Sequence, residues 1–118
     1  YRSKKKLKMK KIFCFDIDGI ICKTTKNNYK NSKPIKKNII FINKKYNEGN
    51  YIKIFTARYM GRNNDNVTKA KKQAKTLTKK QLARWKVNYH KLIFGKPSFD
   101  YLIDDKAINV KHLDKLKI

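Results

Sequence analysis

Four of the eight acidic residues of this chain stand in two close pairs. Asp16 and Asp18 follow an apolar run that starts at Ile12, and Asp104 and Asp105 follow a second run. Side chains two positions apart share one face of an extended chain, so Asp16 and Asp18 point the same way. Clustered carboxylates need a cation to neutralise them. Oxygen ligands with no His or Cys nearby favour Mg²⁺, so the two pairs predict a magnesium site.

A hydroxyl and an ammonium complete this candidate site. Thr56 ends the apolar run Tyr51–Thr56, and Lys96 follows a shorter run, between Gly95 and Pro97. Both side chains are suitable phosphate contacts. A carboxylate can attack phosphorus to form an aspartyl-phosphate, while a cation and a lysine stabilise the phosphoryl oxygens. These residue types therefore predict phosphoryl transfer.

Four strands are expected to position these groups. They span residues 11–17, 51–56, 92–94 and 99–103. The first is a continuous run of β-branched and aromatic residues, which is typical of a buried strand in a parallel sheet. The carboxyl ends of parallel strands gather at one edge of the sheet, where open α/β folds bind their ligands. All the candidate groups are therefore expected at one edge.

Helices are expected between these strands and after the last one. The first begins at Pro34 with Ser32 near the cap, and Gly49 ends it as a left-handed cap. A closing helix is predicted over residues 108–116. The first helix has one apolar face, formed by Ile35, Ile39, Ile42 and Tyr46.

Two further helices are expected before the third strand. Val67, Ala70, Ala74 and Leu77 mark the buried face of one, and Thr78 caps a short second one with Gln81 at the capping-box position. Strands that alternate with helices predict an α/β fold, namely a three-layer, Rossmann-like parallel sheet with helices on both faces. Residues 20–33 and 58–66 are polar, and we expect a flap over the site and a loop there.

The chain length indicates one domain, predicted over residues 11–118. Residues 1–10 form a basic lead-in or linker, and Met9 could be a native start. Cys14 and Cys22 have no partner at zinc-ligand spacing, and a disulfide-poor chain fits a reducing compartment, so we expect a cytoplasmic protein. The sequence contains no apolar stretch of membrane-spanning length.

The net charge is +24, with 32 basic residues. Such a charge can indicate a nucleic-acid partner. Only four of the basic residues are Arg, although Arg makes the best bidentate contacts with phosphates and bases. The excess of Lys, Asn and Ile in every segment is typical of an AT-rich genome, and we favour that explanation. Because Arg is used so rarely, Arg58 and Arg62 are candidate functional residues.

The ordered motifs resemble those of the haloacid dehalogenase superfamily of aspartyl-phosphate phosphatases. Asp16-Ile17-Asp18-Gly19 resembles the first motif, Thr56 the second, Lys96 the third and Asp104-Asp105 the fourth. The resemblance covers nearly the whole chain from Lys11 onward. It implies a Mg²⁺-dependent phosphomonoester hydrolase.

Roles for single residues follow from the same resemblance. Asp16 is implied to be the nucleophile and a Mg²⁺ ligand. Asp18 is implied to be the general acid/base, with its backbone carbonyl on the metal. The phosphoryl group is implied to contact Thr56, Lys96 and the backbone around Gly19. The implied metal ligands also include Asp104 and Asp105.

Two features refine this expectation. The family usually has Thr after Asp-x-Asp-Gly, whereas this chain has Ile20. Because that hydroxyl transfers no group, we expect activity to be retained, although a weakened or inactive enzyme becomes more plausible. Neither gap between motifs holds a cap domain. The segments around Arg58, Arg62 and Lys106 resemble small capless phosphatases found with capsular and surface-polysaccharide biosynthesis genes. The implied substrate is a sugar phosphate, with Arg58, Arg62 and Lys106 as its contacts.

Two rival functions stay open at this point. A polynucleotide 3′-end phosphatase would suit an uncapped site and the strong positive charge, and it would bind with a steep salt dependence. A non-catalytic, regulatory domain of a larger polypeptide would suit Ile20 and a chain that opens at Tyr1. The sequence also leaves a homo-oligomer open.

Overall fold

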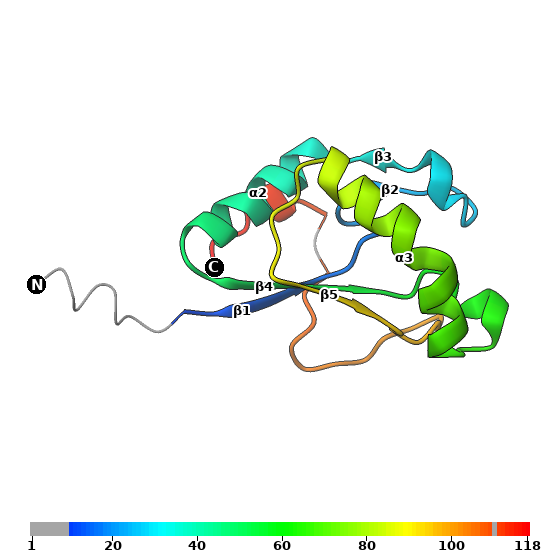
Figure 1. The fold of residues 1–118 in the computed structure, drawn as a ribbon. Helices are drawn as coiled ribbons and strands as arrows, with labels where there is room; N and C mark the ends of the chain where they lie inside the picture. Colours follow the sequence, from blue (N-terminus) through cyan, green and yellow to red (C-terminus); the bar gives the residue numbers. More distant parts are fainter. Residues whose placement is uncertain (1–9, 110) are drawn as a thin grey trace, which may run out of the picture.

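A three-stranded parallel sheet forms the centre of the computed structural model, which describes residues 10–109 and 111–118. Its strands are β1 (Ile12–Phe15), β4 (Tyr51–Thr56) and β5 (Lys91–Phe94), in the order β1-β4-β5 (Figure 1). Ile12 pairs with Tyr51, and Thr56 pairs with Phe94. The α/β class and the parallel sheet are thus as predicted, and the bounds of β4 match the prediction. Residues 1–9 of the proposed lead-in (residues 1–10) lie outside the described residues.

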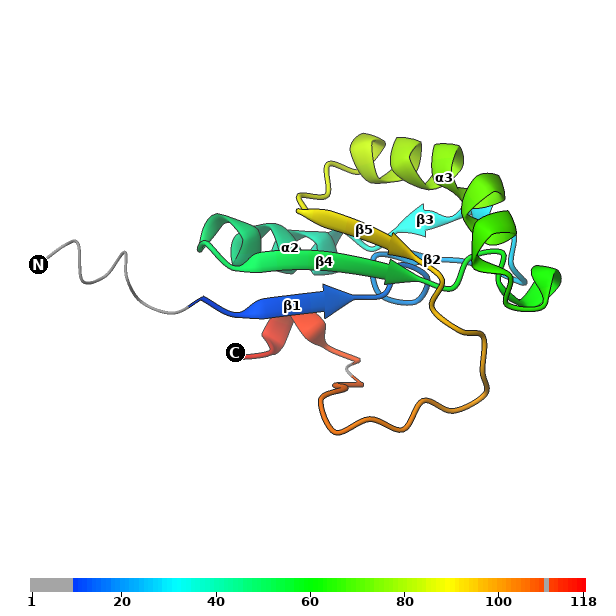
Figure 2. The same cartoon turned by 60° about the horizontal axis from the view of Figure 1, so that its bottom comes forward.

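Two helices, α2 (Lys36–Asn47) and α3 (Val67–Arg84), cover the same face of this sheet (Figures 1 and 2). Phe15, Ile52 and Ile54 are buried on that face. The crossovers β1-α2-β4 and β4-α3-β5 step across the sheet in one direction. Since such crossovers are right-handed, they place both helices on one side. The predicted three-layer arrangement, with helices on both faces, is therefore not confirmed in the described part of the chain.

The helix boundaries differ from the predicted ones. The first helix begins at Lys36, while Pro34 lies in a short strand and Ser32 caps nothing there. Residues 67–84 form one helix, so the predicted division at Thr78 is wrong. The cause is a stripe of small and apolar residues at fourfold spacing that no Gly or Pro interrupts. This stripe consists of Ala70, Ala74, Thr78 and Leu82, all buried.

The last third of the chain also departs from prediction. Residues 99–103 form no strand, and only the 3₁₀ turn η3 (Leu113–Lys115) stands where a closing helix was expected; Val110 of that helix lies outside the described residues. Tyr101 and Ile103 are 87% and 94% exposed. A strand needs a hydrogen-bonded neighbour, and none of the described strands pairs with this segment. Residues 95–109 instead loop away below the sheet in Figure 2.

The expected flap is a small hairpin beside the carboxyl edge of the sheet. Its strands β2 (Cys22–Lys23) and β3 (Lys33–Pro34) are antiparallel, and the 3₁₀ turn η1 (Tyr29–Asn31) lies between them. Thr24 and Ser32 share a hydrogen bond of 2.6 Å across the hairpin. Another 3₁₀ turn, η2 (Gly61–Asn63), lies in the loop after β4. Among the described residues, none of the helices could cross a membrane.

Candidate active site

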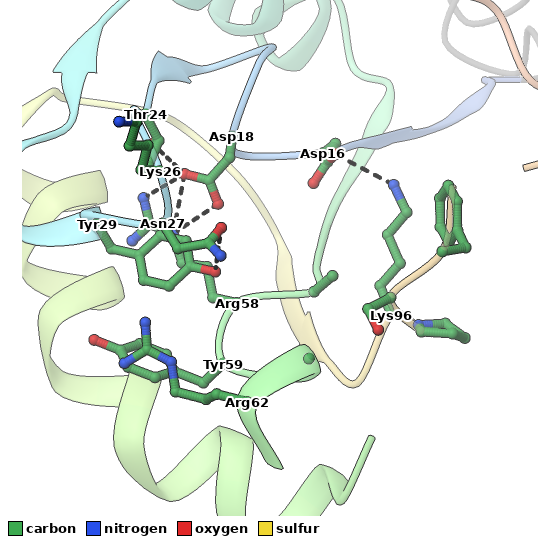
Figure 3. A pocket seen from close by; sticks show the side chains of 15 residues that line it. Asp16, Asp18, Thr24, Lys26, Asn27, Tyr29, Arg58, Tyr59, Arg62 and Lys96 are labelled. Carbon is green, nitrogen blue, oxygen red and sulfur yellow. Dashed lines mark hydrogen bonds and ion pairs between the residues drawn. The ribbon is translucent and has the colours of Figure 1, made fainter. Parts of the chain in front are cut away.

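A cavity of about 350 Å³ opens at the carboxyl ends of the three strands. Asp16 and Asp18 enter it from the end of β1, Arg58 and Arg62 from the loop after β4, and Lys96 from the segment after β5 (Figure 3). The flap tip closes one side with Lys26, Asn27 and Tyr29. Five of the residues singled out from the sequence therefore line one cavity.

Asp16 faces Lys96 at one side of this cavity (Figure 3). Lys96 Nζ lies 3.2 Å from Asp16 Oδ2, and the Ile17 N–H donates to Asp16 Oδ1 at 2.8 Å. Burial raises the pKa of Asp16 from its ordinary value, while the Lys96 ammonium acts against that rise. The paired ammonium and the backbone donor thus favour the carboxylate form, which is the nucleophilic one.

A glycine turn places Lys96 opposite Asp16. Gly95 has a φ of +98°, which is unfavourable for any residue with a Cβ atom. A Cβ built there would lie 2.9 Å from Cγ1 of Val67, at the start of α3. The next amide, of Lys96, donates to the carbonyl of Thr56 at 3.1 Å. Gly95 therefore permits the close approach of this segment to α3.

Asp18 is held by Arg58 through a forked ion pair. Nε lies 3.0 Å from Oδ2, and Nη2 lies 3.0 Å from Oδ1. The Arg58 side chain is fully buried, whereas the Asp18 side chain is 26% exposed. The Thr24 hydroxyl also donates to Oδ1, at 2.5 Å. Such bidentate, charge-assisted contacts fix the plane of the carboxylate.

The third nitrogen of the Arg58 guanidinium, Nη1, connects the site to α3 and to the flap. Nη1 donates to Gln81 Oε1 at 2.5 Å and approaches Thr78 Oγ1 at 3.3 Å. Gln81 Nε2 in turn donates to the carbonyl of Tyr29 in the flap at 2.7 Å. Thr56 is fully buried, and its hydroxyl accepts from the Arg58 backbone amide at 3.1 Å. Thr56 thus positions Arg58 here and does not line the cavity.

The outer part of the cavity is built from arginine and tyrosine side chains. The Arg62 guanidinium carbon lies 4.3 Å from the ring centroid of Tyr59 and 5.8 Å from that of Tyr29. The two tyrosine rings lie 5.0 Å apart. Tyr59 adopts a left-handed φ of 65°, which is uncommon for a bulky residue. The loop after β4 therefore turns sharply to bring Tyr59 and Arg62 over the flap.

The other predicted site residues lie outside this cavity. Asp104, Asp105 and Lys106 are exposed on the segment after β5. Asp104 Oδ1 accepts a hydrogen bond from the Lys106 amide at 3.2 Å, and this bond lowers the pKa of Asp104. Gly19 turns with a φ of +95°, and its amide donates to the carbonyl of Cys22. The predicted metal ligands Asp104 and Asp105, the predicted substrate contact Lys106 and the predicted phosphate contact Gly19 thus do not line the cavity.

Comparison with known proteins supports the fold. No protein-family model and no curated protein matches the chain. The crystal structure of a target protein from Vibrio cholerae is similar, with a TM-score of 0.83 and 25% sequence identity. The similarity covers 91% of this chain and 89% of that protein. It extends over nearly the whole chain and is consistent with a Rossmann-like α/β fold.

The four carboxylates predicted as magnesium ligands are not gathered at one point in the described part of the chain. No group of three or more His, Cys, Asp or Glu side chains is clustered for a metal ion in residues 10–109 and 111–118. Lys96 and Arg58 already neutralise Asp16 and Asp18. Asp104 and Asp105, the remaining predicted ligands, are exposed outside the cavity. The predicted dependence on Mg²⁺ stays a prediction.

Several residues of the site were not predicted from the sequence. The flap supplies Thr24, Lys26, Asn27 and Tyr29, and the helix α3 supplies Thr78 and Gln81. For the two residues of α3, the sequence did contain a signal. Thr78 belongs to the buried stripe of α3 and Gln81 lies next to it, and a polar side chain buried there needs a hydrogen-bond partner. The flap residues gave no comparable signal, because their positions depend on how the hairpin folds over the sheet.

Proposed function

We propose that the protein is a phosphomonoester hydrolase that works through an aspartyl-phosphate on Asp16. The observation that supports it is the pair of carboxylates in one cavity, each with its own cation. Asp16 lies 3.2 Å from the Lys96 ammonium, and Asp18 is paired with Arg58. One carboxylate can then attack phosphorus while the other transfers the proton.

The proposed chemistry has two steps. The first step requires Asp18 to be protonated at Oδ2. Oδ2 of Asp16 attacks phosphorus, the bond to the leaving oxygen breaks, and the proton on Asp18 passes to that oxygen. Asp18 then takes a proton from water, which attacks the same phosphorus and releases phosphate from Asp16. Asp18 Oδ2 accepts only one described hydrogen bond, from Arg58 Nε, so it keeps a lone pair for this proton. The Lys96 ammonium stabilises the negative charge, which lies on Asp16 before the attack and on the phosphoryl oxygens during it.

Ile20 does not weaken this proposal. Its side chain is partly buried and packs against the core cluster. A hydroxyl beside Asp18 is present nevertheless, because Thr24 reaches Oδ1 from the flap. The site therefore keeps an oriented Asp18 carboxylate without a threonine at position 20.

The proposed substrate is a small phosphorylated metabolite, and a sugar phosphate of surface-glycan synthesis is the class suggested by the motifs. The proposed enzyme uses Mg²⁺, as the resemblance implies. No step above is assigned to the ion.

The decisive experiment compares Asp16→Asn with the wild-type protein. Phosphate release is measured with Mg²⁺ over sugar phosphates, nucleotides and a 3′-phosphorylated oligonucleotide. We expect the rate of the variant to be lower than that of the wild type by at least about a thousandfold, since the nucleophile is absent. Asp100→Asn, at an exposed aspartate outside the cavity, is the control and should keep the wild-type rate. Equal background rates for all three proteins would refute the proposal and favour a non-catalytic domain.

A polynucleotide 3′-end phosphatase is the second candidate. Lys71, Lys72 and Lys75 line a shallow hollow on α3 and could contact a phosphate backbone. This function predicts that the oligonucleotide is the best substrate of the panel. It also predicts that its KM rises steeply with salt.

A further inference from the structure

We propose that the outer part of the cavity is a second anion site, which binds a carboxylate or phosphate on the leaving group of the substrate. The inference rests on the proposed hydrolase function, since it specifies the substrate of that same cavity. Arg62 is its principal residue and Lys26 assists from the flap. The substrate class is then a phosphomonoester with a second anionic group.

The charges of the cavity are unevenly balanced. Its inner cations are neutralised, because Lys96 pairs with Asp16 and Arg58 pairs with Asp18. Arg62 and Lys26 also line the cavity. Neither has an acidic group within 4.0 Å in the described part of the chain. The outer end thus carries two uncompensated positive charges.

Arg62 is held in an orientation that suits anion binding. Its guanidinium lies over the Tyr59 ring at 4.3 Å, a cation–π contact that fixes the plane of the group. The stacked plane leaves the N–H edges free, and none of the hydrogen bonds among the described residues is donated by Arg62. Free edges of a fixed guanidinium match the geometry of a carboxylate or phosphate.

The same packing argues against a base-stacking or sugar-stacking platform. The Tyr59 ring contacts Arg62 and lies 5.0 Å from the Tyr29 ring. Tyr29 lies in turn 5.0 Å from the Arg58 guanidinium carbon. These tyrosine rings therefore already pack against arginine side chains and against each other. What they present to a ligand is positive charge.

Three of the six described non-glycine residues with a left-handed φ line this cavity. Lys26, Asn27 and Tyr59 all have left-handed φ values, of 48°, 58° and 65°. Such conformations cost free energy in residues with a Cβ atom, and they persist where the surrounding structure enforces them, often at ligand sites. Lys26 and Tyr59 are the two of these residues whose types rarely adopt such a φ, and both lie at the outer part of the cavity.

The two anion positions fit one small molecule. Lys96 and Arg62 lie on opposite sides of the cavity (Figure 3). A volume of about 350 Å³ is near the lower end for small-molecule sites. A compact metabolite with a phosphate at one end and an anion at the other would fill it.

The kinetic test uses three substrates that share one scaffold. Glucose 1-phosphate has one anion, glucuronic acid 1-phosphate adds a carboxylate, and glucose 1,6-bisphosphate adds a phosphate. We expect one of the doubly anionic compounds to exceed glucose 1-phosphate in kcat/KM by about tenfold or more, as one charge-assisted pair would give. The better of the two identifies the source of the anion. Equal values for all three would overturn the inference and leave the hydrolase proposal intact.

Substitutions test whether Arg62 causes the preference for doubly anionic substrates. Arg62→Met should reduce the ratio of the doubly to the singly anionic substrate to about one, mainly through KM, and Arg62→Lys should retain part of it. Arg84→Met, at the exposed end of α3, is the control and should keep the wild-type ratio. A ratio unchanged in Arg62→Met would overturn the assignment.

A binding measurement separates this inference from catalysis. Calorimetry on Asp16→Asn compares the dissociation constants of the same three compounds, with and without Arg62→Met. Tighter binding of a doubly anionic compound that depends on Arg62 supports the second anion site even if no compound is hydrolysed. If none of the three compounds binds more tightly than another, the site is refuted whatever the enzymatic result.

Discussion

Arg58 and Asp18 form a forked ion pair in which the guanidinium is fully buried and the carboxylate is 26% exposed. The same guanidinium reaches Gln81 on α3, which contacts the flap through the Tyr29 carbonyl. Arg58 thus stabilises three segments at once, and it orients the carboxylate that we propose as the proton carrier.

Replacing Arg58 by Met should therefore reduce both stability and activity. The change leaves Asp18, Gln81 and Thr78 without their shared donor, which should lower the free energy of unfolding by about 2–3 kcal/mol. Urea unfolding measures this loss. Arg84→Met, at an exposed arginine, should stay within about 0.5 kcal/mol of the wild type. A loss no larger than that of Arg84→Met would contradict the structural role of the pair.

Asp16→Asn should abolish activity without the loss of stability that core changes cause. Burial raises the pKa of Asp16 in the folded protein, so the folded state holds a proton at a higher pH than the unfolded state. The charged form therefore costs stability at neutral pH, and the variant avoids that cost. We expect Asp16→Asn to be at least as stable as the wild type at pH 7.

The pH dependence checks the sign of this effect. As the pH falls through the raised pKa toward the ordinary value of 3.8, Asp16 becomes protonated in the folded wild type. The wild type should then gain stability relative to Asp16→Asn. The difference between their free energies of unfolding should become constant below about pH 3.8. Urea unfolding of both proteins at several pH values measures this. A gap that widens as the pH falls would contradict the raised pKa.

Gly95→Ala should destabilise the protein and misplace Lys96. The left-handed φ of +98° and the 2.9 Å approach to Val67 Cγ1 both act against a Cβ, at a combined cost on the order of 2–4 kcal/mol. Gly61→Ala is the matched control, because its Cβ would meet Ser98 at an ordinary 3.8 Å. Thermal melting should show a clear decrease in melting temperature for Gly95→Ala and little decrease for Gly61→Ala. Adding Val67→Ala to Gly95→Ala should restore the steric part only.

Magnesium should be required for activity and should protect the segment after β5. Asp104 and Asp105 are exposed there, so they can contribute to the site only if residues 97–105 come closer to Asp16. We expect EDTA to abolish phosphate release and Mg²⁺ to restore it. Asp104→Asn should raise the Mg²⁺ concentration for half-maximal rate by about tenfold or more. Trypsin cleavage near Lys106 should slow when Mg²⁺ and phosphate are both present. Full activity in EDTA would contradict the predicted requirement for Mg²⁺.

Local sequence patterns were sufficient for the central sheet. The bounds of β4 follow from an apolar run between Gly49 and the polar residues after Thr56. The approach of Asp16 to Lys96 follows from the rule that parallel strands gather their carboxyl ends at one edge. Both features depend on hydrophobic runs and chain direction, which a sequence displays directly.

Features that depend on tertiary packing were not predictable in the same way. Thr78 and Gln81 have the types and spacing of a helix cap, yet they are buried on α3 against Arg58. The run at residues 99–103 has strand composition, but a strand also needs a free neighbouring edge in the right place. The contact between Arg62 and Tyr59 depends on a left-handed turn that a tyrosine rarely adopts. No local pattern indicates that turn.

The position of β1 at the end of the sheet has a practical consequence for the experiments above. Its outer edge pairs with none of the other described strands, although the turn η3 lies beside it in Figure 2, and the Ile12 and Cys14 side chains are exposed. Open edges of this kind template the addition of a strand from another molecule. Concentrated samples are therefore expected to self-associate through the part of β1 that η3 leaves uncovered, and oxidation of Cys14 would make such pairs covalent. Assays at low protein concentration under reducing conditions will keep the measured rates those of the separate chains.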